Sequence, residues 1–445
     1  MPGSKVLFLG VCQTVLVLLL SVLLSRLLVS PDPVMMGAAL AGFALVATLL
    51  WYEKLSLPVM LATFFWAGMG IPFRNIAEIV RWIVLGVAAA AGLLVWVMAR
   101  KPFRFGYLHL LAALCTTIFL LSYATSPNPT MTILKASSVG FLFLYGSFGG
   151  LLYIGSRERS FFVVAKLACE TAVYAIAIFY IILADPVFGN PNSLGAIMAV
   201  VIWPFLFWDF LTIPKGPVWY RKLFAVILCA WILYNSLARA AFLAAAAATL
   251  FLLLAMRRKR MIFAFGVIAL LGALVISTFR PADWNTLIAG VVYKRMTDTE
   301  VLESRRPRWQ EASEEIQKAP WFGNGFGAAK DISETWAGGV ATQGLNRERG
   351  SSYLTLVASV GFLGAVPAVL LLLLLLTKIW RTCKRVRLSG CALDPSIPTA
   401  ALLLAGLCHV LFEDWLLATG YYLSVVFWIL AFFLIDREDT ARYQG

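Results

Sequence analysis

Apolar runs of about twenty residues, each long enough to cross a bilayer as a helix, recur along almost the whole sequence. The runs are continuous and do not alternate between apolar and polar positions, as the strands of a membrane β-barrel would. Hydrophobic residues make up 61% of the chain and charged residues only 13%. The predicted fold class is therefore all-α, a polytopic integral membrane protein with about twelve to fourteen transmembrane helices.

Basic clusters lie at alternate connections between the apolar runs, at residues 100–104, 157–159, 215–222, 257–260 and 378–387. Because short loops rich in Lys and Arg stay on the cytoplasmic side, these connections and both termini are predicted to be cytoplasmic. The first run, from Val6 to Val29, is too long for the core of a signal peptide and is expected to be an uncleaved span. Membrane orientation also accounts for the net charge of +14, so no nucleic-acid partner is expected.

One long hydrophilic segment, residues 280–350, interrupts the series of apolar runs. Since the connections alternate, this loop is predicted to face the outer side of the membrane. The expected organisation is N-terminal transmembrane helices over 1–184, central transmembrane helices over 185–279, the large outer loop over 280–350, C-terminal transmembrane helices over 351–435 and a cytoplasmic tail over 436–445.

The large loop contains a segment with helical periodicity, RRPRWQEASEEIQKAPWFGNGFG (305–327). Its apolar residues are spaced to form one stripe on a helix, which Pro320 and the following glycines would end. The stripe consists of Trp309, Ala312, Ile316 and Ala319. We expect an amphipathic helix that lies along the outer membrane interface with Trp309 as its anchor.

Arginines occur at the outer ends of the predicted spans. Arg239 begins one span, Arg308 lies in the large loop, and Arg349 precedes the span that starts near residue 352. An arginine at the bilayer centre is costly, whereas at the boundary its planar guanidinium can bind phosphate through two hydrogen bonds. Three such arginines could hold a lipid diphosphate and stabilise it as a leaving group. Alternatively, they only extend towards lipid phosphates.

Acidic residues follow at the outer end of the penultimate span, HVLFEDWLLATG (409–420). His409 and Glu413 are four residues apart and would share one helical face. Glu413 or Asp414 could then accept a proton from an attacking hydroxyl, with the imidazole as partner. Alternatively, Glu413 forms a structural ion pair with one of the arginines.

Three further features have structural interpretations. Lys166 and Glu170 are four apart within a span and are expected to pair with each other. The segment FGNPNSLG (188–195) predicts a turn, with Asn192 or Ser193 capping the helix that follows. The two histidines of the chain lie too far apart for a metal-binding spacing, so no metal site is predicted.

Five motifs in a fixed order resemble the O-antigen ligase and polymerase superfamily, the Wzy-C group. They are GNPNSLG, SLARAAFL, RPRWQEA with WFGNGFG, SSYLTLVASVGFLG and HVLFEDWL, between residues 185 and 435. The resemblance implies a GT-C type membrane glycosyltransferase in the bacterial inner membrane, with its active face and the large loop on the periplasmic side. It would take glycan from undecaprenyl diphosphate, without metal or cofactor, and pass it to an acceptor hydroxyl with inversion.

The resemblance also assigns residues. By position, Arg239 matches the arginine that such enzymes place beside the diphosphate, and Arg308 or a neighbouring arginine matches one in the loop. The candidate catalytic residues are Arg239, Arg349, Glu413, Asp414 and Glu348. The candidate substrate-binding residues are Arg305, Arg306, Arg308, Asn190, Asn192, Ser351, Tyr353 and His409.

The sequence departs from the superfamily at one position, because the histidine of the ligases falls on Gly350 and the loop has no histidine. This absence favours a polymerase of exopolysaccharide or O-antigen repeat units over a ligase that transfers glycan to lipid A-core or another acceptor. A flippase or transporter for a lipid-linked sugar is a third alternative, although few charges are buried in the spans. The expected partners are the lipid-linked donor, a glycan or lipid acceptor, the lipid bilayer and a chain-length regulator.

Overall fold

The computed structural model describes residues 56–68, 74–98, 106–183, 191–278, 305–327 and 350–444. Within these ranges the chain is helical and contains no strand. Seven of the described helices are long and apolar enough to cross a membrane, and three shorter apolar helices accompany them. The predicted all-α, multi-pass class is confirmed. The two predicted spans before residue 52, and the candidates Asn190, Glu348 and Arg349, lie outside the described residues.

The first described helices come from the N-terminal part of the chain. They are α3 (Ser56–Gly68), α4 (Arg74–Met98), α5 (Tyr107–Leu121), the 3-10 turn η2 (Ser122–Thr125), α6 (Pro129–Tyr145), the π-helical turn η3 (Gly146–Gly150), α7 (Leu151–Ser156) and α8 (Glu158–Leu183). The central group consists of α9 (Pro191–Ile197), the π-helical turn η4 (Met198–Ile202), α10 (Trp203–Thr212), α11 (Pro217–Ser236), α12 (Arg239–Ala255) and α13 (Lys259–Thr278). The last group is α15 (Arg306–Lys318), α17 (Ser352–Ser389), α18 (Ser396–His409) and α19 (Tyr422–Gln444).

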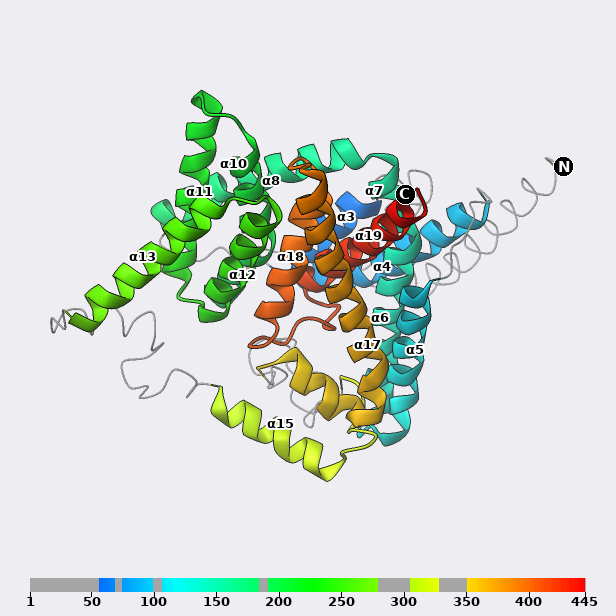
Figure 1. Ribbon diagram of the computed structural model, residues 1–445. Coiled ribbons are helices and arrows are strands. Elements are labelled where there is room, and N and C mark those ends of the chain that lie inside the picture. Colours follow the sequence, from blue (N-terminus) through cyan, green and yellow to red (C-terminus); the bar gives the residue numbers. More distant parts are fainter. Residues whose placement is uncertain are drawn as a thin grey trace.

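Helices α12, α17 and α18 pack together at the centre of the molecule, α17 also packs against α5, and α19 packs against α3, α6 and α18. Aromatic side chains of α19 fill the core, where Phe427, Trp428 and Phe432 are fully buried. Figure 1 shows α15 crossing the lower end of the molecule, next to the first turns of α17 and far from α8. We call this lower end the α15 end.

The predicted pair of Lys166 with Glu170 is wrong. Lys166 forms an ion pair with Asp209 of α10 at 3.0 Å, and Glu170 forms one with Lys222 of α11 at 2.8 Å. Lys222 also reaches Asp209 at 2.5 Å. The reason is tertiary packing, because α10 and α11 lie against α8 and bring partners that sequence spacing does not reveal. Glu170, Asp209 and Lys222 are buried, so each charge is neutralised by its neighbours.

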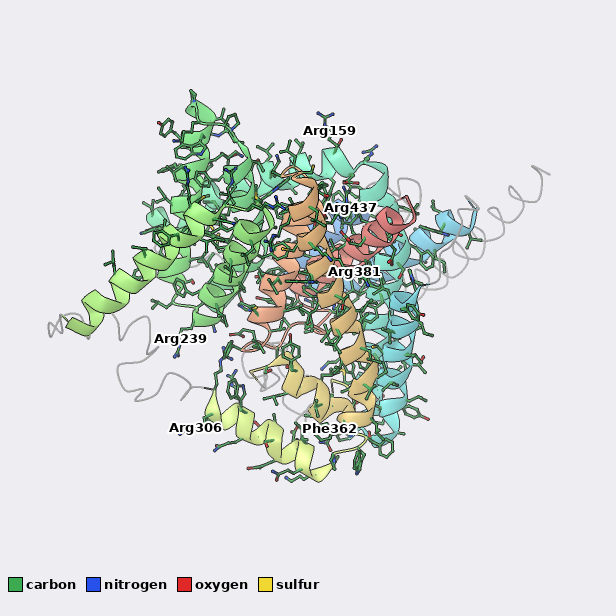
Figure 2. All side chains as sticks on the ribbon, viewed as in Figure 1. Arg159, Arg239, Arg306, Phe362, Arg381 and Arg437 are labelled. Carbon is green, nitrogen blue, oxygen red and sulfur yellow. The ribbon has the colours of Figure 1, made fainter. Side chains whose placement is uncertain are left out.

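Ion pairs also join the helices at the end opposite α15. Arg385 of α17 bonds the carboxylates of Asp394 and Glu438, and Arg437 of α19 bonds Glu158 at the start of α8. Figure 2 shows Arg437 and Arg159 at this upper end, whereas Arg239 and Arg306 lie in the lower half of the molecule. The two ends therefore carry separate groups of arginines.

Candidate functional site

The motifs that the sequence analysis singled out come together at the α15 end. Gly195 of α9 packs against the turn before α12, where an added Cβ would lie 2.7 Å from Ser236 Oγ and 2.5 Å from Ala238. Tyr422 at the start of α19 donates a hydrogen bond to the carbonyl of Ser193 at 3.1 Å. α15 packs against α17. These contacts join α9, the turn before α12 and the start of α19, and they join α15 with α17.

The side chain of Ser352 connects the start of α17 with residues 410–421. Its hydroxyl donates to the carbonyl of Glu413 at 3.0 Å and accepts from the amides of Trp415 and Leu416, both at 3.1 Å. A hydroxyl has one donor and two acceptor positions, so these three bonds use its full capacity. The amide of Ser352 also donates to the carbonyl of Val410 at 3.0 Å. Ser352 therefore fixes the turn that carries the acidic candidates.

Glu413 and Asp414 lie in this turn and not on a helix. α18 ends at His409, so the prediction that His409 and Glu413 share a helical face is wrong. The carboxylate of Glu413 forms an ion pair with Arg305 at the start of α15, and both side chains are less than one-fifth exposed. Asp414 Oδ2 lies 2.6 Å from the hydroxyl of Thr355. Arg305 thus contacts one of the two neighbouring carboxylates, and Thr355 of α17 contacts the other.

Three other candidates belong to the scaffold next to this turn. His409 is buried, and its Nδ1 accepts a hydrogen bond from Trp415 Nε1 at 2.9 Å. Tyr353 donates to the carbonyl of Leu407 at 3.0 Å and so joins α17 to α18. Ser351 is buried as the residue before α17. These three residues thus hold the start of α17 and the end of α18 in place next to the turn.

α15 forms as predicted, from Arg306 to Lys318, and Ala319 and Pro320 follow its end. Its apolar face, however, packs on the protein. Trp309 lies against Phe412, with 6.2 Å between ring centroids, and donates to the carbonyl of Gly350 at 3.3 Å. The predicted membrane anchor is therefore an internal contact, because the start of α17 and the turn after α18 cover this face. Arg306 and Arg308 are exposed on α15.

The break within α17 at Gly361 creates a seat for the glycine-rich turn. Gly361 has a left-handed backbone (φ +70°), which glycine adopts without a steric penalty. The carbonyl of Ser359, just before the break, accepts from the amide of Gly325 at 2.9 Å. The amide of Phe362, just after it, donates to the carbonyl of Pro320 at 2.8 Å. The turn thus satisfies backbone groups that the break frees from the helix.

Close approach of the two backbones requires glycine on both sides. A Cβ on Gly361 would lie 2.3 Å from the carbonyl oxygen of Trp321, and one on Gly323 would lie 2.4 Å from that of Ser359. The close neighbour of Gly361 is therefore the backbone of a loop and not another helix. On its other side the turn inserts Phe326, which stacks on Phe119 of α5 at 4.2 Å.

Arg239 is the first residue of α12 and is half-buried. Figure 2 shows it at the lower end of α12, in the same half of the molecule as Arg306. Asn192 is half-buried in the first turn of α9. Neither Asn192 nor Ser193 caps α9, because the helix already begins at Pro191, a residue type that favours the first helical position.

A comparison with protein families finds one match within the chain. Residues 224–369 match the family model described as O-antigen ligase. This Wzy_C match covers about a third of the chain and agrees with the resemblance to the Wzy-C group seen in the sequence. Members of this family are membrane ligases and polymerases of the glycosyltransferase kind. No curated protein matches the chain.

The Wzy_C domain holds Arg239, the whole of α15 and Ser352. Glu413 and Asp414 lie beyond its C-terminal limit, yet Ser352, Thr355 and Arg305 bind the turn that carries them. The acidic candidates are therefore attached to the domain through its own residues.

Arg81 of α4 was missed by the sequence analysis. Its guanidinium donates to the carbonyl of Gly420 at 2.7 Å and lies over the ring of Trp82, 5.1 Å from its centroid. Arg81 thus brings the N-terminal part of the chain to the turn at 410–421. No sequence motif surrounds Arg81. Its position near the start of an apolar run is the one sequence signal that could have marked it as a contact residue.

Proposed function

We propose that the protein is a metal-independent inverting glycosyltransferase of the inner membrane that polymerises repeat units of an exopolysaccharide or O-antigen. Its donor is a glycan linked to undecaprenyl diphosphate at the periplasmic face. The observation that carries this proposal is the Wzy_C domain, with Arg239 and the arginines of α15 in the same half of the molecule.

The chemistry requires a leaving group, a nucleophile and a base. The bond between the anomeric carbon of the donor and the diphosphate oxygen breaks, while the acceptor hydroxyl oxygen bonds that carbon from the opposite face. The hydroxyl proton passes to a base. Negative charge develops on the diphosphate, and guanidinium groups such as that of Arg239 stabilise it through paired hydrogen bonds.

Glu413, Asp414 and Glu348 are the candidates for the base. Glu413 takes part in the ion pair with Arg305, which is the structural alternative that the sequence left open. Asp414 contacts the hydroxyl of Thr355. Glu413→Gln, Asp414→Asn and Glu348→Gln, assayed side by side for glycan transfer, test the three candidates, and the base is the residue whose variant loses the most activity.

Gly350 supports polymerase over ligase chemistry. It occupies the position of the ligase histidine, has φ +71°, and a Cβ there would lie 3.3 Å from Trp309 Nε1 and 3.4 Å from Arg305 Cδ. A side chain at this position would be strained and crowded. The ligase alternative keeps its support from the description of the matching family, O-antigen ligase.

The test is to delete the gene in its native host and to size the glycans linked to undecaprenyl. Single repeat units on the carrier would support the polymerase, because chain growth would have stopped. Long chains that remain on the carrier would instead indicate a ligase. Units trapped on the cytoplasmic side would indicate a flippase and contradict the proposal.

A further inference from the structure

An exposed apolar patch lies beside the break in α17. It consists of Trp321 and Phe322 from the glycine-rich turn and of Phe362 and Leu363 from α17, each between 52% and 66% exposed. We call these four residues the turn patch. Figure 2 shows Phe362 at the lower end of the molecule, near α15.

The backbone holds the turn patch in one arrangement. The amide of Phe362 donates to the carbonyl of Pro320 at 2.8 Å, and that of Leu363 donates to the carbonyl of Trp321 at 3.3 Å. The exposed side chains are therefore attached to a fixed backbone and are not at the tip of a free loop. Four large apolar side chains held side by side at a surface indicate an interaction site.

The turn patch continues a longer apolar surface. Beyond Leu363, the exposed residues of α17 recur every three or four positions along one helical face: Val366, Val369, Leu370 and Leu373. This part of α17 is a candidate membrane span, so the face is suited to contact with lipid acyl chains. The turn patch forms its end, at the point where the chain bends away. Tryptophan is enriched at this depth of a membrane, between acyl chains and headgroups.

α15 itself offers no comparable surface, since its apolar face packs on the protein through Trp309 and Ala312, which is fully buried. Arg306 and Gln310, four residues apart, lie on its outer face, and both are exposed. The helix therefore meets the bilayer through the residues that follow it.

We infer that the turn patch inserts into the boundary between the acyl chains and the headgroups of the bilayer. It thereby sets the height of α15 relative to the membrane surface. The occupant of the patch is phospholipid, because the patch is continuous with the exposed apolar face of a membrane-spanning helix. This inference does not depend on the proposed reaction.

Photo-crosslinking of the full chain tests the inference. The photoreactive residue p-benzoylphenylalanine replaces Trp321 or Phe322 in two test variants. In the matched control it replaces Gln310, on the outer face of α15. Each position is exposed, so the substitutions leave the packing intact. The protein is reconstituted in vesicles of phosphatidylethanolamine and phosphatidylglycerol that carry a labelled acyl chain, and is then irradiated.

The expected result is a several-fold higher yield of lipid adduct at residues 321 and 322 than at 310. Equal yields at all three positions would overturn the inference, because the patch would then have no preferred contact with the bilayer. Adducts between two copies of the chain, in place of lipid adducts, would also overturn it, since the patch would then be a protein interface. Phe362, on the other side of the seat, provides an independent second position with the same expectation.

Discussion

The two ends of the molecule are held together by different interactions. At the end opposite α15, ion pairs between side chains join α17, α19 and α8, as in Arg385 with Glu438 and Arg437 with Glu158. At the α15 end, the ion pair of Arg305 with Glu413 is accompanied by neutral contacts. The Ser352 hydroxyl binds the turn after α18, and backbone hydrogen bonds hold the glycine-rich turn at the break at Gly361.

This difference suggests that arginines contribute to stability at one end of the molecule and to the reaction at the other. Removal of one partner from a buried ion pair leaves an uncompensated charge and is strongly destabilising. Neutral hydrogen bonds and glycine contacts fix a chain without using the positive charge of an arginine. We therefore expect substitution of the ion-paired Arg385 at the opposite end to lower stability, and substitution of Arg239 at the α15 end to lower activity.

The largest effect is expected from Arg239→Lys. Lysine keeps the charge but lacks the planar fork that binds two phosphate oxygens, and loss of one donor to a developing negative charge lowers kcat on the order of 100- to 1,000-fold. The measurement is glycan transfer by the purified variant from the lipid-linked donor. Arg159→Lys, an exposed arginine at the opposite end, is the control and should stay close to wild type. Normal activity of Arg239→Lys would contradict a role of Arg239 in the reaction.

Arg385→Ala should lower the free energy of unfolding by about 3 kcal/mol. The carboxylate of Glu438, only 6% exposed, would lose the cation Arg385, whereas Asp394 keeps Arg437 at 3.3 Å. The estimate is at the low end for a buried pair because the Arg385 side chain is itself 32% exposed. Thermal unfolding in detergent measures the change. Arg387→Ala, which replaces an exposed arginine of the same helix, should leave the unfolding midpoint unchanged, and an equal loss in both variants would refute the structural role.

Gly361→Ala should cost about 2 kcal/mol, because it combines an unfavourable positive φ with overlap against a loop backbone. Gly390→Ala is a matched control, since Gly390 has nearly the same φ (+68°) and nothing within 4 Å of its added Cβ. The difference in unfolding midpoint between the two variants isolates the contact with the glycine-rich turn. Equal midpoints would show that this contact contributes nothing.

Ser352→Ala should have the smallest effect, about 1 to 2 kcal/mol, because the amides of Trp415 and Leu416 lose their acceptor. Hydrogen exchange of the segment 410–421 should increase. In the control Thr377→Ala, the lost hydroxyl bonds only the carbonyl of Leu373 in its own helix, so exchange in 410–421 should not change. Unchanged exchange in Ser352→Ala would remove the proposed link between α17 and the acidic turn.

Local patterns predicted the elements of the fold. Hydropathy located the spans, and the helical spacing that begins at Trp309, with Pro320 as its stop, predicted α15 and the place where it ends. These signals lie within single segments, so they can be read from the sequence. The end of α18 was missed because Val410, Leu411 and Phe412 continue its apolar run, although the chain turns at His409.

The contacts of the site depend on segments far apart in the sequence. Nothing near Ser352 indicates that its hydroxyl binds the backbone of Glu413, and nothing near Arg81 indicates Gly420. The partners of Lys166 and Glu170 were missed for the same reason. The face of α15 was misassigned because an apolar stripe fits a membrane and a protein surface equally well, and only the tertiary fold distinguishes them.

The central claim is that this chain transfers glycan from a lipid diphosphate with the arginines of its α15 end. The most direct measurement uses the purified protein in vesicles with a repeat unit linked to undecaprenyl diphosphate. Product length and free undecaprenyl diphosphate are followed together, for wild type and Arg239→Lys. The account predicts longer glycans with release of one lipid diphosphate per bond formed, and loss of both products in the variant. Movement of the intact donor across the membrane without release of diphosphate would contradict it.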